Sequence, residues 1–297
     1  MAHNIFKGLG IALITPFISE GSVDYDALKQ LIEYQLVNGA DFLCILATTG
    51  EAPCLTQQER DDITAFIRER VAGRVPILKY CGGNNTAAVV EEIKTTDWAG
   101  IDGILSICPY YNKPSQEGIY QHFKAIAEST ELPIILYNVP GRVGVSIQPE
   151  TIKRLTDVCP NIVGVKDAAG NWDQVTKEKI LLPDDFMIYS GDDAFTLPVL
   201  AAGGVGVISV ASHVIGEDLL SMIDAFEKGN LAAARRLHLK MYPIMKGMFF
   251  IASPIPVKTA VNLIGQPGGN FRLPMVAPTK EEESHVRTLL ENYGFLL

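Results

Sequence analysis

Eight short runs of apolar, β-branched-rich sequence recur along the first part of this 297-residue chain. Each run has the length of a buried strand, and a segment with helical periodicity and recognisable ends separates it from the next. The expected strands cover residues 8–15, 41–46, 75–80, 102–107, 133–138, 162–166, 186–190 and 205–210. The expected helices cover residues 24–38, 56–72, 86–99, 115–129, 149–158, 173–182, 192–202 and 217–228.

This alternation restricts the fold. A strand–helix unit repeated eight times predicts an all-parallel sheet, because right-handed crossover connections need that length of chain. Eight such units close naturally into a (β/α)8 TIM barrel. A doubly wound open sheet is the alternative, but it normally carries a phosphate-binding glycine fingerprint after its first strand. Here Pro16 and Phe17 follow the first strand. We therefore expect an α/β chain whose residues 1–229 form a catalytic (β/α)8 barrel.

The strand pattern stops after Gly229. Helices are expected over 230–241, 254–265 and 279–293, with Pro243, Pro267 and other breakers between them. The sequence thus predicts a small C-terminal helical domain over 230–297, which packs on the barrel or on another subunit.

Composition narrows the partners and the compartment. The net charge is −9 and no basic block occurs, so nucleic acid and anionic membrane surfaces are not expected as partners. The N-terminus lacks the apolar core of a signal peptide, and no apolar run approaches the length of a membrane span. The five cysteines are scattered without a CxxC pair. We expect a reducing cytoplasm, no bound metal and no cofactor.

A lysine ends the sixth expected strand. Lys166 follows the apolar run 162–165, and its only charged neighbour in sequence is Asp167. Such a lysine either extends to water at the mouth of the strand or stays desolvated as an amine that can attack a carbonyl group. The strand alone does not decide between the two interpretations.

Other strand ends carry polar groups that suit carbonyl chemistry. Thr48 and Thr49 precede a glycine, and the backbone N–H groups of such a turn can converge on a carboxylate. Tyr137 can exchange a proton near a lysine, and Arg142 can bind a carboxylate through two hydrogen bonds. Taken singly, the threonine pair is better interpreted as an ordinary hydroxyl-rich turn, and Arg142 could be a solvated surface arginine. A further pair of tyrosines follows the fourth strand at Tyr110 and Tyr111.

Together these groups favour chemistry on a carboxylated carbonyl compound. An α-keto acid such as pyruvate would condense with neutral Lys166, and its carboxylate would bind the turn at Thr48 and Thr49. The resulting enamine is a carbon nucleophile. The residue types do not define the second substrate.

The motifs, taken in order, resemble the pyruvate-dependent, class I aldolase-type family that contains dihydrodipicolinate synthase and N-acetylneuraminate lyase. The resemblance covers essentially the whole chain and fits the expected (β/α)8 barrel. Its motifs are TP at 15–16, TTGE at 48–51, PYYNKPSQEG at 109–118, YNVPGR at 137–142, GVKDAAGN at 164–171, SGDD at 190–193, GVISV at 206–210 and PIPVK at 254–258.

The resemblance implies a role for each matching residue. Lys166 would form the Schiff base with pyruvate, and Tyr137 would donate and accept protons beside it. Thr48 and Tyr111 would complete a proton relay, with Tyr111 reaching the site of a neighbouring subunit. The residues that would bind substrates are Thr49 and Arg142 for carboxylates and Gly191 and Ile208 for the pyruvate pocket. The family's usual assembly implies a homotetramer built from two tight dimers.

The arginine of YNVPGR resembles the synthase branch of the family. This implies condensation of pyruvate with L-aspartate 4-semialdehyde, the first committed step of lysine and diaminopimelate biosynthesis. A pyruvate-dependent sugar-acid lyase, acting on N-acetylneuraminate or 2-keto-3-deoxygluconate, is the alternative enzyme. A barrel that only binds a keto acid is the alternative outside catalysis, and it would be expected to have lost Lys166 or Tyr137.

The chain also departs from the family pattern. Ala47 stands where glycine is commoner, and Val143 where threonine or serine is frequent, but neither change removes a reacting group. Part of a lysine-feedback site is present in Gly82, Asn84 and Tyr110. Several neighbouring positions differ from that pattern, namely Ala52, Pro53, Gln57 and Arg60. Ala88 replaces a glutamate that would pair with the lysine ammonium, so feedback inhibition by lysine should be weak or absent.

Overall fold

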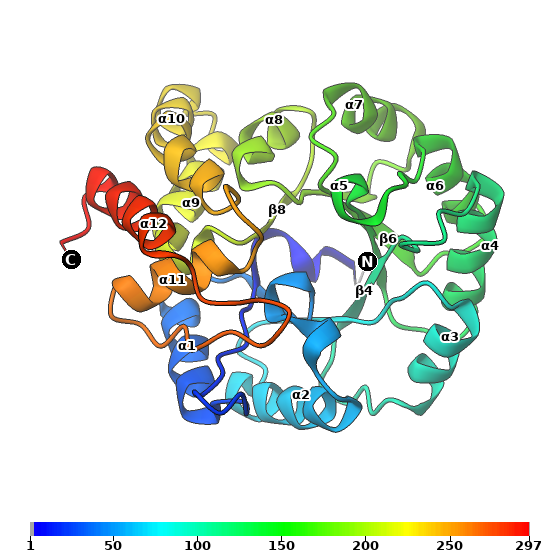
Figure 1. Ribbon diagram of the computed structural model, residues 1–297. Coiled ribbons are helices and arrows are strands. Elements are labelled where there is room, and N and C mark those ends of the chain that lie inside the picture. The colour runs from blue at the N-terminus through cyan, green and yellow to red at the C-terminus, as the bar shows by residue number, and fades with distance from the viewer. Residues whose placement is uncertain (1–2, 297) are drawn as a thin grey trace. The chain divides into compact units, whose positions relative to one another are not determined.

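A computed structural model describes residues 3–296 and contains eight parallel strands that follow one another in chain order around a closed barrel. Figure 1 shows the alternation of strands and helices along the chain. The strands are β1 (Gly8–Ala12), β2 (Phe42–Ile45), β3 (Ile77–Tyr80), β4 (Gly103–Ile107), β5 (Ile134–Asn138), β6 (Ile162–Asp167), β7 (Met187–Ser190) and β8 (Gly206–Ser209). The predicted (β/α)8 barrel is confirmed.

Helices connect and follow the strands. The α-helices are α1 (Tyr25–Val37), α2 (Gln57–Val71), α3 (Thr86–Thr95), α4 (Gln116–Ala127), α5 (Pro140–Val143), α6 (Pro149–Thr156), α7 (Trp172–Leu181), α8 (Thr196–Ala201), α9 (Ser212–Glu227), α10 (Leu231–Gly247), α11 (Ile255–Leu263) and α12 (Lys280–Tyr293). Four short 3-10 helices are η1 (His3–Phe6), η2 (Thr48–Gly50), η3 (Ala52–Cys54) and η4 (Asp193–Phe195).

The chain divides into two compact units. Among the described residues, the first unit comprises 3–8 and Ile77–Ile208. Its strands β3 to β8 pair in parallel, each with the next, and helices α3, α4, α6, α7 and α8 pack in the same order. Strands β4 to β8 are buried along their whole length, as expected for a parallel sheet covered by helices.

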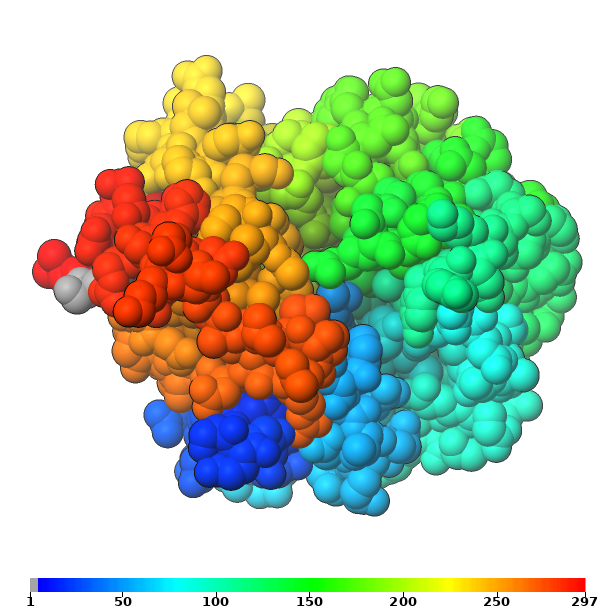
Figure 2. All heavy atoms as spheres, viewed as in Figure 1, coloured from blue at the N-terminus to red at the C-terminus, as the bar shows by residue number. Residues whose placement is uncertain are grey.

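The second unit comprises Leu9–Pro76 and the chain from Ser209 onward. Strand β1 pairs in parallel with β2, and α1 packs on α2. Helix α10 packs on α9 and α12, and α11 contacts both α9 and α12. The segment that precedes α12, orange in Figure 2, lies against the dark blue residues near the N-terminus, where the Asn270 backbone N–H donates to the Phe17 carbonyl at 2.8 Å.

Most predicted helix ends agree with the structure because local capping decides them. The Thr56 side chain accepts from the Glu59 backbone N–H, and the Glu59 carboxylate accepts from the Thr56 backbone N–H, which is the predicted capping box. At α1 the Asp24 side chain accepts from the Ala27 backbone N–H at 2.9 Å and caps the helix. Helix α3 is shorter than predicted and ends at Thr95, and the Trp98 indole N–H then donates to the Ile93 carbonyl at 2.7 Å.

Three predicted helices differ in a physically informative way. The segment 192–202 is the 3-10 helix η4 followed by α8. Helix α9 begins five residues before the predicted start at 217, with non-helical dihedral angles at Ile215, because residues 212–216 are buried against the second unit's core. Helix α10 continues through Pro243, although a proline interrupts the helical hydrogen bonds. Met241 and Met245 on either side are fully buried, and this packing holds the helix together.

The boundary predicted at residue 229 between a barrel and a C-terminal helical domain stays a prediction.

Among residues 3–296, no helix is both long enough and apolar enough to cross a membrane.

Candidate active site

Lys166 is buried in the first unit beside Tyr137. The two residues are register partners on the adjacent strands β6 and β5. The Lys166 side chain is 4% exposed, and its Nζ lies 4.5 Å from the centroid of the Tyr137 ring. Within the described chain the ammonium forms no ion pair. The burial favours a desolvated amine over a side chain that extends to water.

Close backbone packing fixes where Lys166 sits. Gly164 lies two residues earlier on β6, and a Cβ added there would be 2.7 Å from the Met187 carbonyl oxygen. The absence of a side chain therefore lets β6 approach β7 closely. At the carboxyl end of β6, the Gly191 backbone N–H donates to the Asp167 carbonyl at 2.6 Å. The backbone of β6 is therefore held by close contacts both before Lys166, at Gly164, and after it, at Asp167.

The residues that follow Tyr137 and Lys166 are joined by hydrogen bonds. The Asn138 amide donates to Asp167 Oδ2 at 2.8 Å, and the Gln174 amide donates to the same oxygen at 2.8 Å. Asp167 Oδ1 accepts from the Ala169 backbone N–H at 2.9 Å. This buried network ties the ends of β5 and β6 to helix α7 and restrains the two strand ends that carry Tyr137 and Lys166.

A second buried carboxyl group extends this network. Gln174 Nε2 also donates to Glu178 Oε1 at 3.2 Å, whereas Glu178 Oε2 has no partner. Burial, and secondarily the charge of Asp167, raise the pKa of Glu178 to about 8. Burial also raises the pKa of Asp167, although hydrogen bonds oppose that shift. Two buried carboxylates this close cannot both be charged at low cost, so Glu178 holds a proton at neutral pH.

Arg142 lies on the loop after β5, in the short helix α5. Pro140 begins this helix, and Gly144 ends it in the left-handed conformation at φ 79°. The Arg142 side chain is exposed, and its guanidinium forms no ion pair with residues 3–296. A guanidinium held on a short, rigid turn without a carboxylate partner is suited to bind a carboxylate ligand.

Gly191 and Ile208 occupy the ends of β7 and β8 in the same unit. A Cβ added at Gly191 would lie 2.7 Å from the Ala168 Cβ, so the backbone there approaches the residues after Lys166 closely. Ile208 is buried at 1% exposure. Sequence alone predicted both positions only through the family resemblance.

Tyr110 and Tyr111 follow β4 and differ from the other predicted residues in their exposure. Tyr111 is 89% exposed and adopts a φ of 72°, which is unfavourable for a residue with a side chain. Tyr110 is 40% exposed, and its carbonyl accepts from the Asn84 amide at 3.1 Å. Asn112 in turn donates to the Asn84 carbonyl at 2.8 Å.

Thr48 and Thr49 belong to the second unit, where they form η2 after β2. Thr49 is buried at 5% exposure, and neither threonine hydroxyl is hydrogen-bonded to another described residue. The Glu51 backbone N–H donates to the Thr48 carbonyl at 3.1 Å and closes the turn. Two hydroxyls without a partner in the described chain remain available to a ligand.

The predicted lysine-feedback residues lie together in the first unit. Gly82 follows β3, and the Tyr80 hydroxyl donates to its carbonyl at 3.0 Å. Asn84 bonds to the tyrosine loop as described, and Ala88 is exposed in the first turn of α3. Among residues 3–296, no group of three or more His, Cys, Asp or Glu side chains is arranged to hold a metal ion.

Sequence reasoning missed two groups of residues. Asn138, Gln174 and Glu178 support the strand ends, and Glu178 is one of two acids in a helix that also carries lysines, so it gives no signal of its own. Lys258 does carry a sequence signal, because it is the only charge within the apolar helix α11, IPVKTAVNL. An interior charge in such a helix indicates a buried partner.

We predict that the ionisation of Glu178 lowers the free energy of unfolding as the pH rises. The folded chain keeps a proton on Glu178 between the ordinary pKa of 4.5 and the raised value of about 8, whereas the unfolded chain has lost it. Because the folded state binds more protons, the free energy of unfolding decreases as pH rises through this window. Glu178→Gln has no proton to lose, so its decline in Tm from about pH 5 to pH 9 should be shallower by a few degrees.

Differential scanning calorimetry of the two proteins measures this effect. Glu131→Gln, at an exposed position of the same unit, is the control and should follow the unmodified chain. If Tm declined equally with rising pH in the unmodified chain and in Glu178→Gln, the claim that folded Glu178 holds a proton at neutral pH would be contradicted.

Comparison with known proteins identifies the family of this chain. The family model described as "Dihydrodipicolinate synthetase family" matches residues 5–293. A 4-hydroxy-tetrahydrodipicolinate synthase from Desulforamulus reducens is 44% identical over 285 residues, which is 96% of each chain.

Solved structures agree as well. A dihydrodipicolinate synthase from Thermotoga maritima superposes with a TM-score of 0.95 at 40% identity, covering 98% of this chain and 100% of that one. A monomeric dihydrodipicolinate synthase variant also gives a TM-score of 0.95, at 39% identity and 99% coverage of both chains. Since the family model and the relatives span nearly the whole chain, this protein belongs to the dihydrodipicolinate synthetase family of lyases.

Proposed function

We propose that the chain catalyses a Schiff-base condensation of pyruvate with L-aspartate 4-semialdehyde to give 4-hydroxy-tetrahydrodipicolinate, the first committed step of lysine and diaminopimelate biosynthesis. The observation that carries the proposal is the buried Lys166 amine over the Tyr137 ring, without a carboxylate partner in the described chain. The naming of the relatives as 4-hydroxy-tetrahydrodipicolinate synthases supports the choice of reaction.

The proposed reaction begins at the Lys166 nitrogen. The neutral amine attacks C2 of pyruvate, the carbonyl oxygen leaves as water, and an imine forms. Loss of a proton from C3 gives an enamine, whose C3 then attacks the aldehyde carbon of the semialdehyde. The aldehyde oxygen takes up a proton as the new carbon–carbon bond forms. The amino group of the semialdehyde then attacks C2 and displaces the Lys166 nitrogen, which closes the ring of the product and returns the free lysine amine. Tyr137, next to Lys166, is the proposed donor and acceptor of these protons.

The remaining residues have proposed supporting roles. Thr48 and Tyr111 would relay protons between Tyr137 and solvent, and Thr49 would bind the pyruvate carboxylate. Gly191 and Ile208 would line the pyruvate pocket. The unpartnered hydroxyls of Thr48 and Thr49 and the close backbone approach at Gly191 support these assignments.

Arg142 distinguishes the two enzyme candidates. We propose that its exposed, unpaired guanidinium binds the carboxylate of the semialdehyde. A sugar-acid lyase presents a hydroxylated chain in that position, and a guanidinium gives no matching advantage there. The semialdehyde is therefore the favoured second substrate.

The first test combines a chemical trap with a choice of aldehyde. Borohydride with pyruvate should reduce the imine and add a pyruvate-derived mass to the peptide that contains Lys166. Pyruvate consumption should depend on aspartate semialdehyde and not on N-acetylmannosamine. Lys166→Ala should lose the adduct and at least about 10³-fold in kcat, because removal of a nucleophile abolishes most of an enzyme's rate enhancement.

Lys177, an exposed lysine on α7, provides the matched control. The Lys177→Ala variant should keep both the borohydride-trapped adduct and the turnover of pyruvate with the semialdehyde. Turnover with the sugar alone would move the function to the lyases. The absence of any adduct would show a keto-acid binder.

We also propose that the chain assembles as a homotetramer of two tight dimers. Tyr111 is 89% exposed in the single chain and held at a φ of 72°, a cost that contact with a second copy would offset. One structural relative is a monomeric variant, so the fold does not by itself require assembly. Sedimentation velocity should give the mass of four chains, and a monomer with full activity would exclude a shared Tyr111.

Lysine should inhibit the enzyme weakly or not at all. Gly82, Asn84 and Tyr110 are present, but Ala88 offers no carboxylate to the lysine side-chain ammonium. Ala88→Glu adds that carboxylate at an exposed position and should increase sensitivity by about tenfold, the effect of one charge-assisted hydrogen bond. Steady-state rates at increasing lysine concentration measure this, and micromolar inhibition of the unmodified enzyme would overturn the prediction.

A cytoplasmic location completes the proposal. All five cysteines are free thiols and four of them are buried, which supports a reducing compartment.

A further inference from the structure

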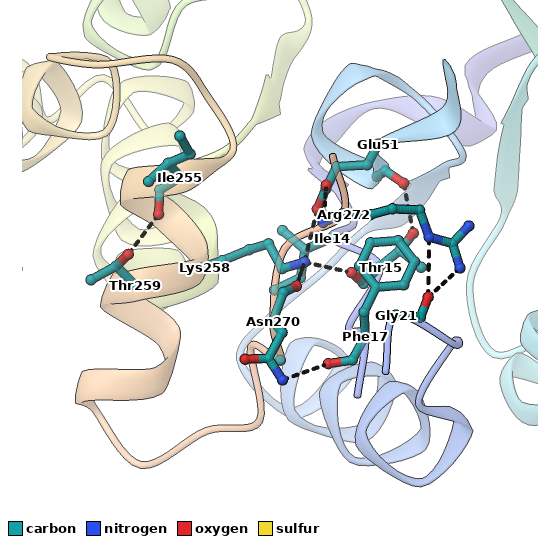
Figure 3. A network of polar contacts seen from close by, with 12 residues as sticks. Ile14, Thr15, Phe17, Gly21, Glu51, Ile255, Lys258, Thr259, Asn270 and Arg272 are labelled. Atoms are coloured by element: carbon teal, nitrogen blue, oxygen red, sulfur yellow. Dashed lines mark hydrogen bonds and ion pairs between the residues drawn. The ribbon is translucent and has the colours of Figure 1, made fainter. Parts of the chain in front are cut away.

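A buried lysine outside the proposed reaction lies in the second unit. Lys258, on α11, is fully buried, and its ammonium has three acceptors. It donates to Glu51 Oε1 at 2.8 Å, to the Thr15 carbonyl at 2.9 Å and to the Asn270 carbonyl. Figure 3 shows these contacts converging on the ammonium. All three N–H groups of the ammonium are therefore used, and no donor is left for a ligand.

The carboxylate partner lies next to the threonine turn. Glu51 follows Gly50 directly, and its side chain is 2% exposed. Its backbone has φ 54° and ψ 33°, a left-handed conformation that costs a residue with a side chain about 1 kcal/mol or more. Glycine would adopt this conformation without that cost. A glutamate at this position indicates that its carboxylate performs a task that glycine cannot.

The second contact of Lys258 reaches the other side of the same turn. Lys258 binds the Thr15 carbonyl, while the Thr15 hydroxyl donates to the Gly50 carbonyl at 2.7 Å. A Cβ added at Gly50 would lie 3.0 Å from the Leu13 carbonyl oxygen, so the turn is packed tightly on the end of β1. The Lys258 ammonium thus binds Glu51, which follows the turn at residues 48–50, and Thr15, which is hydrogen-bonded to that turn.

The C-terminal segment completes this anchor. Gly269 crosses the chain so closely that an added Cβ would lie 2.6 Å from the Phe17 backbone nitrogen, and its φ of 71° also favours glycine. Arg272 then donates from its backbone to Glu51 Oε2 at 3.4 Å. The Arg272 guanidinium binds both oxygens of Glu59 at 2.8 Å, which fixes the start of α2. The turn is therefore held from the strand, the helix and the C-terminal segment.

We propose that Lys258 and Glu51 are positioning residues that set the geometry of the turn at Thr48 and Thr49 for binding the carboxylate of the keto acid. The pair contributes no reacting group. It fixes the backbone N–H groups and hydroxyls of the turn, as a ligand site on a short 3-10 helix requires. The inference rests on the proposed function, because it assigns the turn to pyruvate and not to the second substrate.

The test must separate positioning from folding. Lys258→Met alone leaves Glu51 buried without a counter-charge, which destabilises a protein strongly. The double variant Lys258→Met/Glu51→Gly removes both charges, and the glycine suits the left-handed backbone. It should fold and should still form the borohydride-trapped pyruvate adduct at saturating pyruvate. Its KM for pyruvate should rise about tenfold, while the KM for aspartate semialdehyde should change by less than about twofold.

A second readout does not depend on the reaction. Amide hydrogen exchange in the peptide that contains residues 48–51 should be faster in the double variant, because the turn has lost its anchor. Lys228→Met, an exposed lysine paired with Asp224 in the same unit, is the control and should change neither KM nor exchange.

Each outcome decides the inference. Unchanged exchange at residues 48–51, or an unchanged KM for pyruvate, overturns it, as does an equal rise in both KM values. If the double variant does not fold, Glu51→Gln keeps the shape and one acceptor and should raise the pyruvate KM about threefold by weakening a charge-assisted bond. An unmodified enzyme that forms no pyruvate adduct refutes the proposed function instead, and accelerated exchange would then still establish the anchor.

Discussion

The cost of burying a lysine ammonium governs how this chain is arranged. A buried charge is tolerated when it is paired and all its hydrogen-bond donors are satisfied, and Lys258 meets that condition with a carboxylate and two carbonyls. Lys166 is buried to a similar degree but has no ion-pair partner in the described chain. The same residue type is therefore fully paired at one position and without a carboxylate partner in the described chain at the other, which is the difference on which the proposed role of Lys166 rests.

The buried carboxyl groups near Lys166 are likewise either hydrogen-bonded or kept neutral. Asp167 is adjacent to Lys166 in sequence, yet its two oxygens are occupied by Asn138, Gln174 and the Ala169 backbone. It therefore restrains the strand ends without forming an ion pair with the lysine. Glu178 completes the network, and its raised pKa keeps a second negative charge out of this buried region at neutral pH. Such a network orients residues without binding a ligand itself.

The fold could be predicted because each of its signals is local. Short apolar runs, capping residues such as Thr56 and the glycines after helices place strands and helices within a few residues of their observed ends. Errors arose where tertiary packing decided the outcome. Helix α10 passes through Pro243 because its flanking methionines are buried, and the sequence window around a proline contains no sign of that packing.

The candidate site was only partly predictable. A barrel prediction already contains the adjacency of β5 and β6 and places Tyr137 and Lys166 at the same ends of these strands, whereas their pairing in register depends on an irregularity between Ile134 and Ile135. The supporting contacts do not follow in this way, because Lys258 meets Glu51 across 207 positions of sequence. No periodicity or motif spacing encodes a contact of that range. A charged residue inside an apolar helix indicates that a partner exists but does not identify it.

Backbone strain links these separate observations. Leu46, Glu51 and Tyr111 are not glycines, yet all three have positive φ angles, and each lies at or near a predicted site residue. Glycine at these positions would cost less, so each side chain must contribute more than the strain that it imposes. For Glu51 the contribution is the ion pair with Lys258, which is visible within the second unit. For Tyr111 the ring is 89% exposed, so burial within the single chain does not offset the strain.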